Sequence, residues 1–152
     1  MIKIKEKQEL NVTNLLSFRG KVSQAELEAI SRDMHDTIAG LGAKTMGSVV
    51  TATYDVEGEI IDMEILVPID RPVDSVGRYE YKERLLIVNA VMIEYKGYPE
   101  GLQDAMEQLN QYIIDNHMQP ITVGYNVTKR NDSLVQESVE LEVYVGINPN
   151  IL

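Results

Sequence analysis

The sequence of 152 residues contains no cysteine, no tryptophan and a single phenylalanine. Without cysteine there is no disulfide framework, no thiol nucleophile and no thiolate metal site. Basic residues are also few, since 14 Lys and Arg face 24 Asp and Glu, and the net charge is −10. A chain of that charge repels phosphate backbones, which argues against direct binding to nucleic acid.

Long apolar runs are missing too. None reaches the roughly 18–20 residues that a membrane-spanning helix needs, and the first residues alternate apolar and charged side chains, unlike the apolar core of a signal peptide. We therefore expect a soluble, cytoplasmic protein with no membrane partner. Its 44% hydrophobic and 25% charged residues are ordinary for a globular chain of one domain.

Three pairs of short motifs recur at nearly constant spacing. Phe18-Arg-Gly20 resembles Tyr95-Lys-Gly97, which lies 77 positions later. The other pairs are Gly47 with Gly124, also 77 apart, and residues 61–69 (IDMEILVPI) with 139–147 (VELEVYVGI), which are 78 apart. Self-similarity of this kind indicates an internal repeat.

The repeat predicts one domain, 1–152, built from two similar copies. The first copy spans about 10–70, the linker 70–78 and the second copy about 79–148. Each copy is expected to contain a strand, a helix and two further strands. The fold class is thus α+β, with two tandem β-α-β-β repeats forming an antiparallel sheet, two long helices on one face and a groove on the other.

The elements of each copy are predicted from side-chain periodicity and turn residues. The first copy has strands at Leu10–Arg19, Ser48–Tyr54 and Ile60–Val67, a turn at Asp55–Gly58, and a helix that starts with the capping box Ser23–Glu26 and ends at Gly40 and Gly42. The second copy has strands at Leu85–Tyr95, Ile121–Thr128 and Ser138–Ile147, a turn at Lys129–Asp132, and a helix from Pro99 to about His117. The apolar stripes of the two helices are Leu27, Ile30, Met34, Ile38 and Leu41, and Leu102, Met106, Leu109 and Ile113.

The last strand of each copy alternates apolar and polar side chains, so its two faces differ. Val139, Leu141, Val143 and Val145 share one face, and Glu140, Glu142 and Tyr144 the other. Asp62 and Glu140 are expected to be plain solvent-exposed residues. Glu142 stands next to Tyr144, and a carboxylate beside aromatic rings suits an organic cation, although an exposed sheet residue is the alternative.

The chain resembles the GyrI-like family, the effector-binding domain of AraC- and MerR-type multidrug regulators. The resemblance rests on two short motifs, Val91-Met-Ile-Glu-Tyr-Lys-Gly-Tyr98 followed by Leu102, and Glu142-Val-Tyr-Val-Gly-Ile147. It covers about Leu10 to Ile147. It implies a tandem pair of strand-helix-strand-strand modules, with Glu142 facing a ligand in the groove between them.

The resemblance and the residues together give five candidate ligand-binding residues: Glu142, Tyr144, Tyr125, Tyr95 and Tyr112. The chain departs from the family at Gly146, where proline is usual, and at Val123, where many members have glutamate. Tyr112 stands where many have tryptophan. The missing glutamate and the missing tryptophan count against the hydrolase activity of some members, so no catalytic residue is assigned.

No cofactor and no metal are expected, because His35 and His117 lack a carboxylate at the spacing of a metal-binding helix. Two functions remain. The first is a stand-alone protein that binds an amphipathic, cationic small molecule in the groove between the copies. The alternative is an acidic interaction module, an inhibitor, chaperone or accessory protein that binds a basic protein partner.

Overall fold

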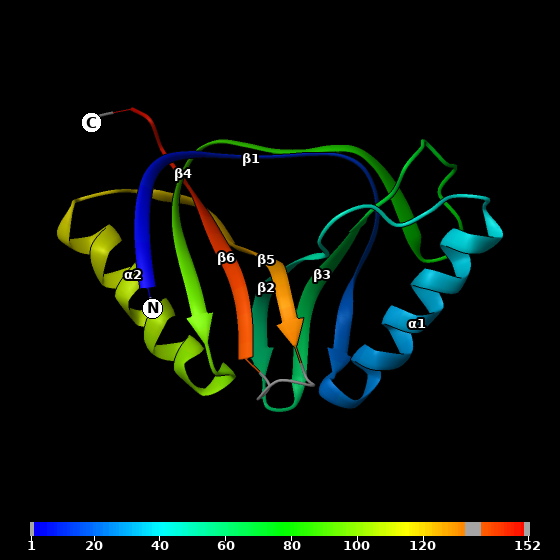
Figure 1. The fold of residues 1–152 in the computed structure, drawn as a ribbon, viewed down its shortest axis with the longest axis horizontal. Helices are drawn as coiled ribbons and strands as arrows, with labels where there is room; N and C mark the ends of the chain where they lie inside the picture. Colours follow the sequence, from blue (N-terminus) through cyan, green and yellow to red (C-terminus); the bar gives the residue numbers. More distant parts are fainter. Residues whose placement is uncertain (1, 133–137, 151–152) are drawn as a thin grey trace. The chain divides into compact units, whose positions relative to one another are not determined.

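The computed structural model describes residues 2–132 and 138–150. These residues form two α-helices and six strands (Figure 1). The elements are β1 (Ile2–Ser23), α1 (Gln24–Gly40), β2 (Val50–Glu57), β3 (Ile60–Pro68), β4 (Tyr79–Gly97), the short 3₁₀ helix η1 (Pro99–Gly101), α2 (Leu102–Asp115), β5 (Pro120–Asp132) and β6 (Ser138–Ile147). Their order is the one predicted for two β-α-β-β copies. Within the described ranges no helix is long and apolar enough to cross a membrane.

The chain divides into two compact units, which are described separately. The first-copy unit is Asn11–Leu86, and the second-copy unit is Met1–Leu10 together with Ile87–Leu152. The division cuts through β1 and β4, so its boundaries differ from those of the predicted copies. Residues 1–10 go with the second copy, and residues 79–86 go with the first.

The two units have the same strand order. In the first-copy unit β3 pairs antiparallel with β1 and with β2. In the second-copy unit β6 pairs antiparallel with β4 and with β5. The last strand of each copy is therefore the central strand of its three, and the predicted α+β class with repeated modules is confirmed.

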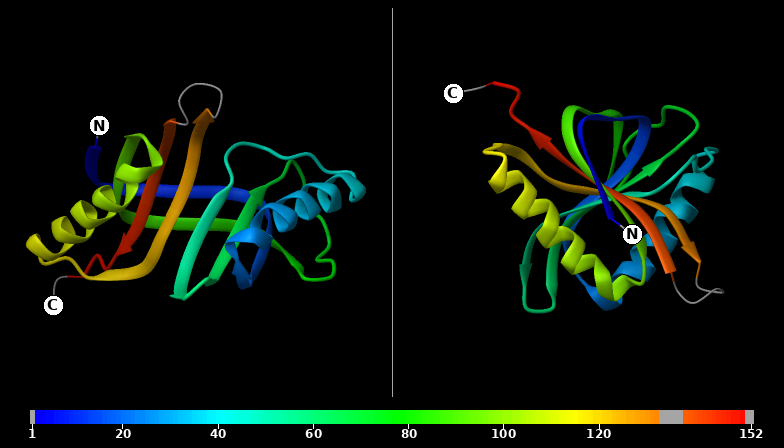
Figure 2. Two further views of the ribbon diagram at one scale, coloured as in Figure 1. Left: turned by 90° about the horizontal axis from the view of Figure 1, so that it is seen from below. Right: turned by 60° about the vertical axis from the view of Figure 1, so that its left-hand side comes forward.

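Each helix lies against the sheet of its own unit (Figure 2). It buries one stripe of side chains there. The buried residues of α1 are Ile30, Met34 and Ile38, and those of α2 are Ala105, Leu109 and Ile113. They pack on alternate residues of the strands, Met63, Ile65 and Val67 in β3 and Leu141, Val143 and Val145 in β6. The faces predicted from alternation are confirmed, and so are the helical stripes at their centres.

The predicted capping box starts α1. The backbone N–H and the hydroxyl of Ser23 both donate to the carboxylate of Glu26, at 3.0 and 2.9 Å. These contacts lower the pKa of Glu26, the backbone hydrogen bond being the larger cause. The chain therefore changes from strand to helix at the residue where the sequence predicted it.

Several strands are longer than predicted. β2 continues through Asp55 to Glu57, so the turn shrinks to Gly58 and Glu59 and the predicted turn at Asp55–Gly58 is wrong. Likewise Lys129–Asp132 belongs to β5 and not to a turn. In both places the ladder of backbone hydrogen bonds extends over polar residues that by themselves favour turns. β1 begins at Ile2, where the alternation of apolar and charged residues is itself a strand pattern.

The aromatic–basic–glycine motifs have one physical cause in both copies. A Cβ on Gly20 would lie 2.9 Å from the ring of Phe18, and one on Gly97 would lie 3.0 Å from the hydroxyl of Tyr95. Residues two apart in a strand share a face, so the ring folds over the glycine and leaves no room for a side chain.

The Gly47 and Gly124 marker is wrong as a repeat. Gly47 precedes β2 with a φ of 68°, which favours glycine. Gly124 lies inside β5, where a Cβ would come 3.2 Å from Val143. The two glycines serve different purposes at positions that do not correspond, and their spacing of 77 is a coincidence.

We expect Gly20→Ala to lower the free energy of unfolding by about 1–3 kcal/mol, because the new methyl group displaces the buried ring of Phe18. Gly40→Ala is the matched control, since its Cβ would meet no heavy atom within 4 Å, and alanine favours a helix. Urea denaturation measures both. Equal effects of the two substitutions would contradict the packing explanation.

Candidate functional site

Glu142 lies in β6 on the face turned away from the α2 cluster, the apolar residues of α2, β4 and β6 that pack together. Its neighbours in sequence, Leu141 and Val143, both belong to that cluster, so alternation places Glu142 opposite. In the ladder it stands directly across from Glu94 of β4 and Val127 of β5. Its side chain is 19% exposed, so the carboxylate is neither fully buried nor freely solvated.

Two groups contact one oxygen of this carboxylate. The hydroxyl of Tyr144 donates to Glu142 Oε1 at 2.9 Å, and Lys129 Nζ lies 3.4 Å from the same oxygen. Tyr144 comes from the same strand, two residues on, and Lys129 comes from β5. Burial, and then the hydrogen bond to Glu142, raise the pKa of Tyr144 well above the ordinary tyrosine value. The phenol is therefore a donor throughout the physiological pH range.

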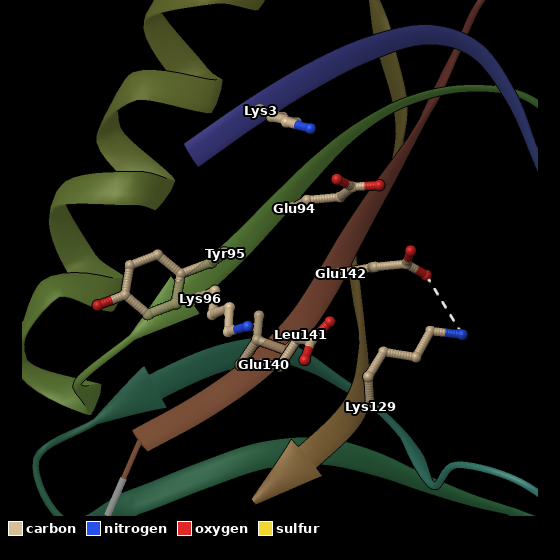
Figure 3. Close-up of a pocket in the computed structure, with 8 residues that line it drawn as sticks. All are labelled: Lys3, Glu94, Tyr95, Lys96, Lys129, Glu140, Leu141 and Glu142. Carbon is tan, nitrogen blue, oxygen red and sulfur yellow. Dashed lines mark ion pairs between the residues drawn. The ribbon is translucent and has the colours of Figure 1, made fainter. Parts of the chain in front are cut away.

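A pocket of about 200 Å³ opens beside Glu142, within the second-copy unit. Figure 3 shows Glu94 and Glu142 side by side in it, with Lys129 reaching up to Glu142. Lys5, which is not drawn there, donates to Glu94 at 2.9 Å. The pocket is lined by Lys3, Glu94, Tyr95, Lys96, Lys129, Glu140, Leu141 and Glu142. Three carboxylates and three ammonium groups thus line a partly apolar hollow.

The structure brings only some of the predicted tyrosines to this face. Tyr144 contacts Glu142, and Tyr125 stands directly across from Tyr144 in the β5–β6 ladder. Tyr95 lines the pocket with its backbone end, but its ring turns to the α2 side (Figure 3), where its hydroxyl donates to the carbonyl of Tyr98. Tyr112 lies on α2 and donates to Glu6.

The two carboxylates expected to be plain surface residues have partners or neighbours. Arg19 holds Asp62 with two hydrogen bonds, at 3.0 and 3.2 Å, and these lower the pKa of Asp62. Glu140 lines the pocket that Glu142 lines. In the part of the chain that the structure describes, no group of three metal-ligating side chains gathers into a metal site.

Glu64 is a carboxylate that the sequence analysis did not single out. It is only 4% exposed, and both of its oxygens are occupied. Lys82 Nζ donates to Oε2 at 2.6 Å, and the hydroxyl of Tyr54 donates to Oε1 at 3.2 Å. The guanidinium of Arg19 lies 3.6 Å from the centre of the Tyr54 ring. The signal was available, because Glu64 precedes Glu142 by the 78 positions of the repeat.

In each unit a carboxylate of the central strand therefore contacts a tyrosine hydroxyl and a lysine. In the first-copy unit these are Glu64, Tyr54 and Lys82, and the contacts are short and buried. In the second-copy unit the lysine contact is longer and the carboxylate borders a pocket. The first arrangement is closed by the chain itself, whereas the second is open to the pocket.

We expect Tyr144→Phe to cost about 1–2 kcal/mol of unfolding free energy, because it removes a hydrogen bond to a charged acceptor. The folded state raises the pKa of Tyr144. The stabilisation of the fold by its hydroxyl is therefore full below about pH 10, the ordinary tyrosine pKa, and is lost as the pH rises further. Denaturation at pH 7 to 11 measures the difference from wild type. Tyr98→Phe, at a residue 55% exposed, is the control and should change the unfolding free energy little at pH 7.

The two lysines should differ in their worth to stability. Lys82→Met leaves Glu64 buried without its ammonium, which should cost about 2–4 kcal/mol. Lys129→Met removes a longer contact whose lysine is 46% exposed, and should change stability by less than about 1 kcal/mol. Thermal or urea unfolding of the two variants compares them. A larger loss of stability for Lys129→Met than for Lys82→Met would contradict the view that Glu64 is closed by its partners and Glu142 is open to the pocket.

No protein-family model matches the chain, and no curated protein does either. Solved structures do. The C-terminal domain of EcmrR has a TM-score of 0.78 at 16% identity, with 97% of both chains covered. In a complex of EcmrR with DNA the TM-score is 0.76 at 17% identity, and the chain spans only 57% of the EcmrR chain.

Two more distant structures extend the comparison. SAV2435 bound to tetraphenylphosphonium has a TM-score of 0.54 at 9% identity, with 98% of this chain and 94% of that chain covered. A protein described as a hydrolase from Listeria innocua has a TM-score of 0.58 at 10% identity, covering 97% and 91%. At these identities the likeness concerns the fold. The chain has the α+β fold of the GyrI-like effector-binding domains, as its sequence motifs predicted.

Proposed function

We propose that this protein binds an amphipathic organic cation, and that Glu142 is the residue that recognises its charge. The observation that carries the proposal is the half-buried carboxylate of Glu142 at the edge of a pocket. A carboxylate in such a place loses part of its hydration, which a cation restores through charge pairing. The pocket's apolar surface then contributes the burial of the ligand's hydrocarbon part.

Aromatic rings next to the carboxylate support the same ligand class. Tyr144 is buried beside Glu142, and Tyr125 is its cross-strand neighbour. Ring faces attract cations when they lie within about 6 Å. Tyr95 and Tyr112, which belong to the α2 side, act in this proposal as packing residues that hold β4 and the helix in place. The placement of the ligand between the two copies stays a prediction.

The structural similarity to SAV2435 suggests a ligand for a binding experiment. SAV2435, which shares the fold, was solved with tetraphenylphosphonium, a lipophilic cation of the class proposed here. We propose binding rather than catalysis, because the tyrosine and the lysine both contact one oxygen of Glu142, and Glu94, the carboxylate across the ladder, is itself paired with Lys5.

Glu142→Gln should weaken the binding of tetraphenylphosphonium by about 1.5–3 kcal/mol, the worth of a charge-assisted contact. The substitution keeps the size and keeps an acceptor for Tyr144, so the fold should remain. Isothermal titration calorimetry with both proteins measures the loss. An uncharged aromatic ligand such as triphenylphosphine oxide should lose much less.

Glu140→Gln is the matched control. It removes one negative charge from the same pocket lining but leaves Glu142 intact, and it should reduce the affinity only slightly. Equal losses in the two variants would mean that the overall negative field, and not Glu142, attracts the cation. If the wild-type protein binds no lipophilic cation at all, the acidic interaction module with a basic protein partner becomes the better explanation.

A further inference from the structure

Lys129 places an ammonium group where the proposed ligand would place its charge. Its Nζ lies 3.4 Å from Glu142 Oε1 and its side chain is 46% exposed. Both Lys129 and Glu142 line the pocket, and Figure 3 shows the lysine extended along the pocket's side toward the carboxylate. The lysine stem is flexible, with an ammonium that turns easily from one acceptor to water.

The first-copy unit shows what a permanent version of this contact looks like. There Lys82 approaches Glu64 to 2.6 Å, and the carboxylate is 4% exposed. At Glu142 the lysine contact is 0.8 Å longer, since 3.4 Å compares with 2.6 Å, and it shares its oxygen with Tyr144. The same three kinds of side chain thus make a short, buried contact in one unit and a longer, more exposed one in the other.

We infer that Lys129 is an internal cation that occupies Glu142 in the ligand-free protein and is displaced when a ligand binds. The inference rests on the proposed function. It makes Lys129 a specificity-determining residue: a ligand must compete with an ammonium that is tethered to the same site. Small hydrated ammonium ions bring no advantage over it, whereas a cation that also buries apolar surface in the pocket does.

The competition has a measurable size. The apparent affinity for a cation is reduced by the fraction of molecules in which Glu142 is free of its lysine. A partly exposed ion pair is worth a factor of about two to five. Removing the ammonium therefore raises the affinity by that factor, and the increase must depend on the carboxylate of Glu142.

The experiment is a double-mutant cycle with tetraphenylphosphonium, measured by calorimetry at fixed ionic strength. Lys129→Met keeps the unbranched apolar stem and should tighten binding about two- to five-fold. In the Glu142→Gln background the same substitution should change the affinity by less than about 1.5-fold, because the lysine then has no charge to compete for. Triphenylphosphine oxide should not respond to Lys129→Met in either background.

Lys3→Met is the matched control, because Lys3 also lines the pocket but is not the lysine paired with Glu142. It should leave the affinity nearly unchanged. An equal gain from Lys3→Met, or a gain from Lys129→Met that persists without Glu142, would mean a general change of field and would overturn the inference. Binding that depends on Glu142 but ignores Lys129 overturns the inference alone, whereas no cation binding to the wild type overturns the proposed function as well.

Discussion

Alternation along β3 and β6 is the constraint on which the rest of this protein depends. Both strands are central in their units, and each must bury every second side chain against its own helix. The residues between are forced onto the other face, where the chain carries carboxylates at Glu64 and Glu142. A shift of one residue in either ladder would bring these charges into the apolar clusters, so the register is strongly specified.

The carboxylates of Glu64 and Glu142 lie on the same face of their strands but have different surroundings. Glu64 is sealed by a lysine and a tyrosine, and stabilisation there requires both partners because a lone buried charge is very costly. Glu142 keeps comparable partners but more exposure and an adjoining pocket. One unit thus closes its carboxylate within the fold, while the other leaves its carboxylate beside a pocket. This difference arises from a few side chains, with the same strand order beneath.

The sequence allowed the repeat, the helices, the capping box and the polar face of β6 to be predicted, because each depends on local spacing. The sequence did not show whether the rings of Tyr95 and Tyr112 point into the pocket. Their orientation is decided by packing with α2 and β1. Gly146 likewise shows its reason only in the structure. Its N–H donates to Thr122 Oγ1 at 2.8 Å, and a Cβ would lie 2.8 Å from that side chain, so the proline usual in the family would not fit.

The division of the chain also bears on the order in which it folds. Residues 2–10 pack with a unit whose remaining residues begin at Ile87, and the whole first-copy unit is made in between. At about 5–20 residues per second the ribosome needs roughly 4–15 s to reach that point, and meanwhile the segment has no native partner. Ile2 and Ile4 alternate there with Lys3, Lys5 and Lys7. Charges at such spacing disfavour the pairing of an unpaired strand with another chain, so we expect these lysines to limit aggregation of the segment before its unit is complete.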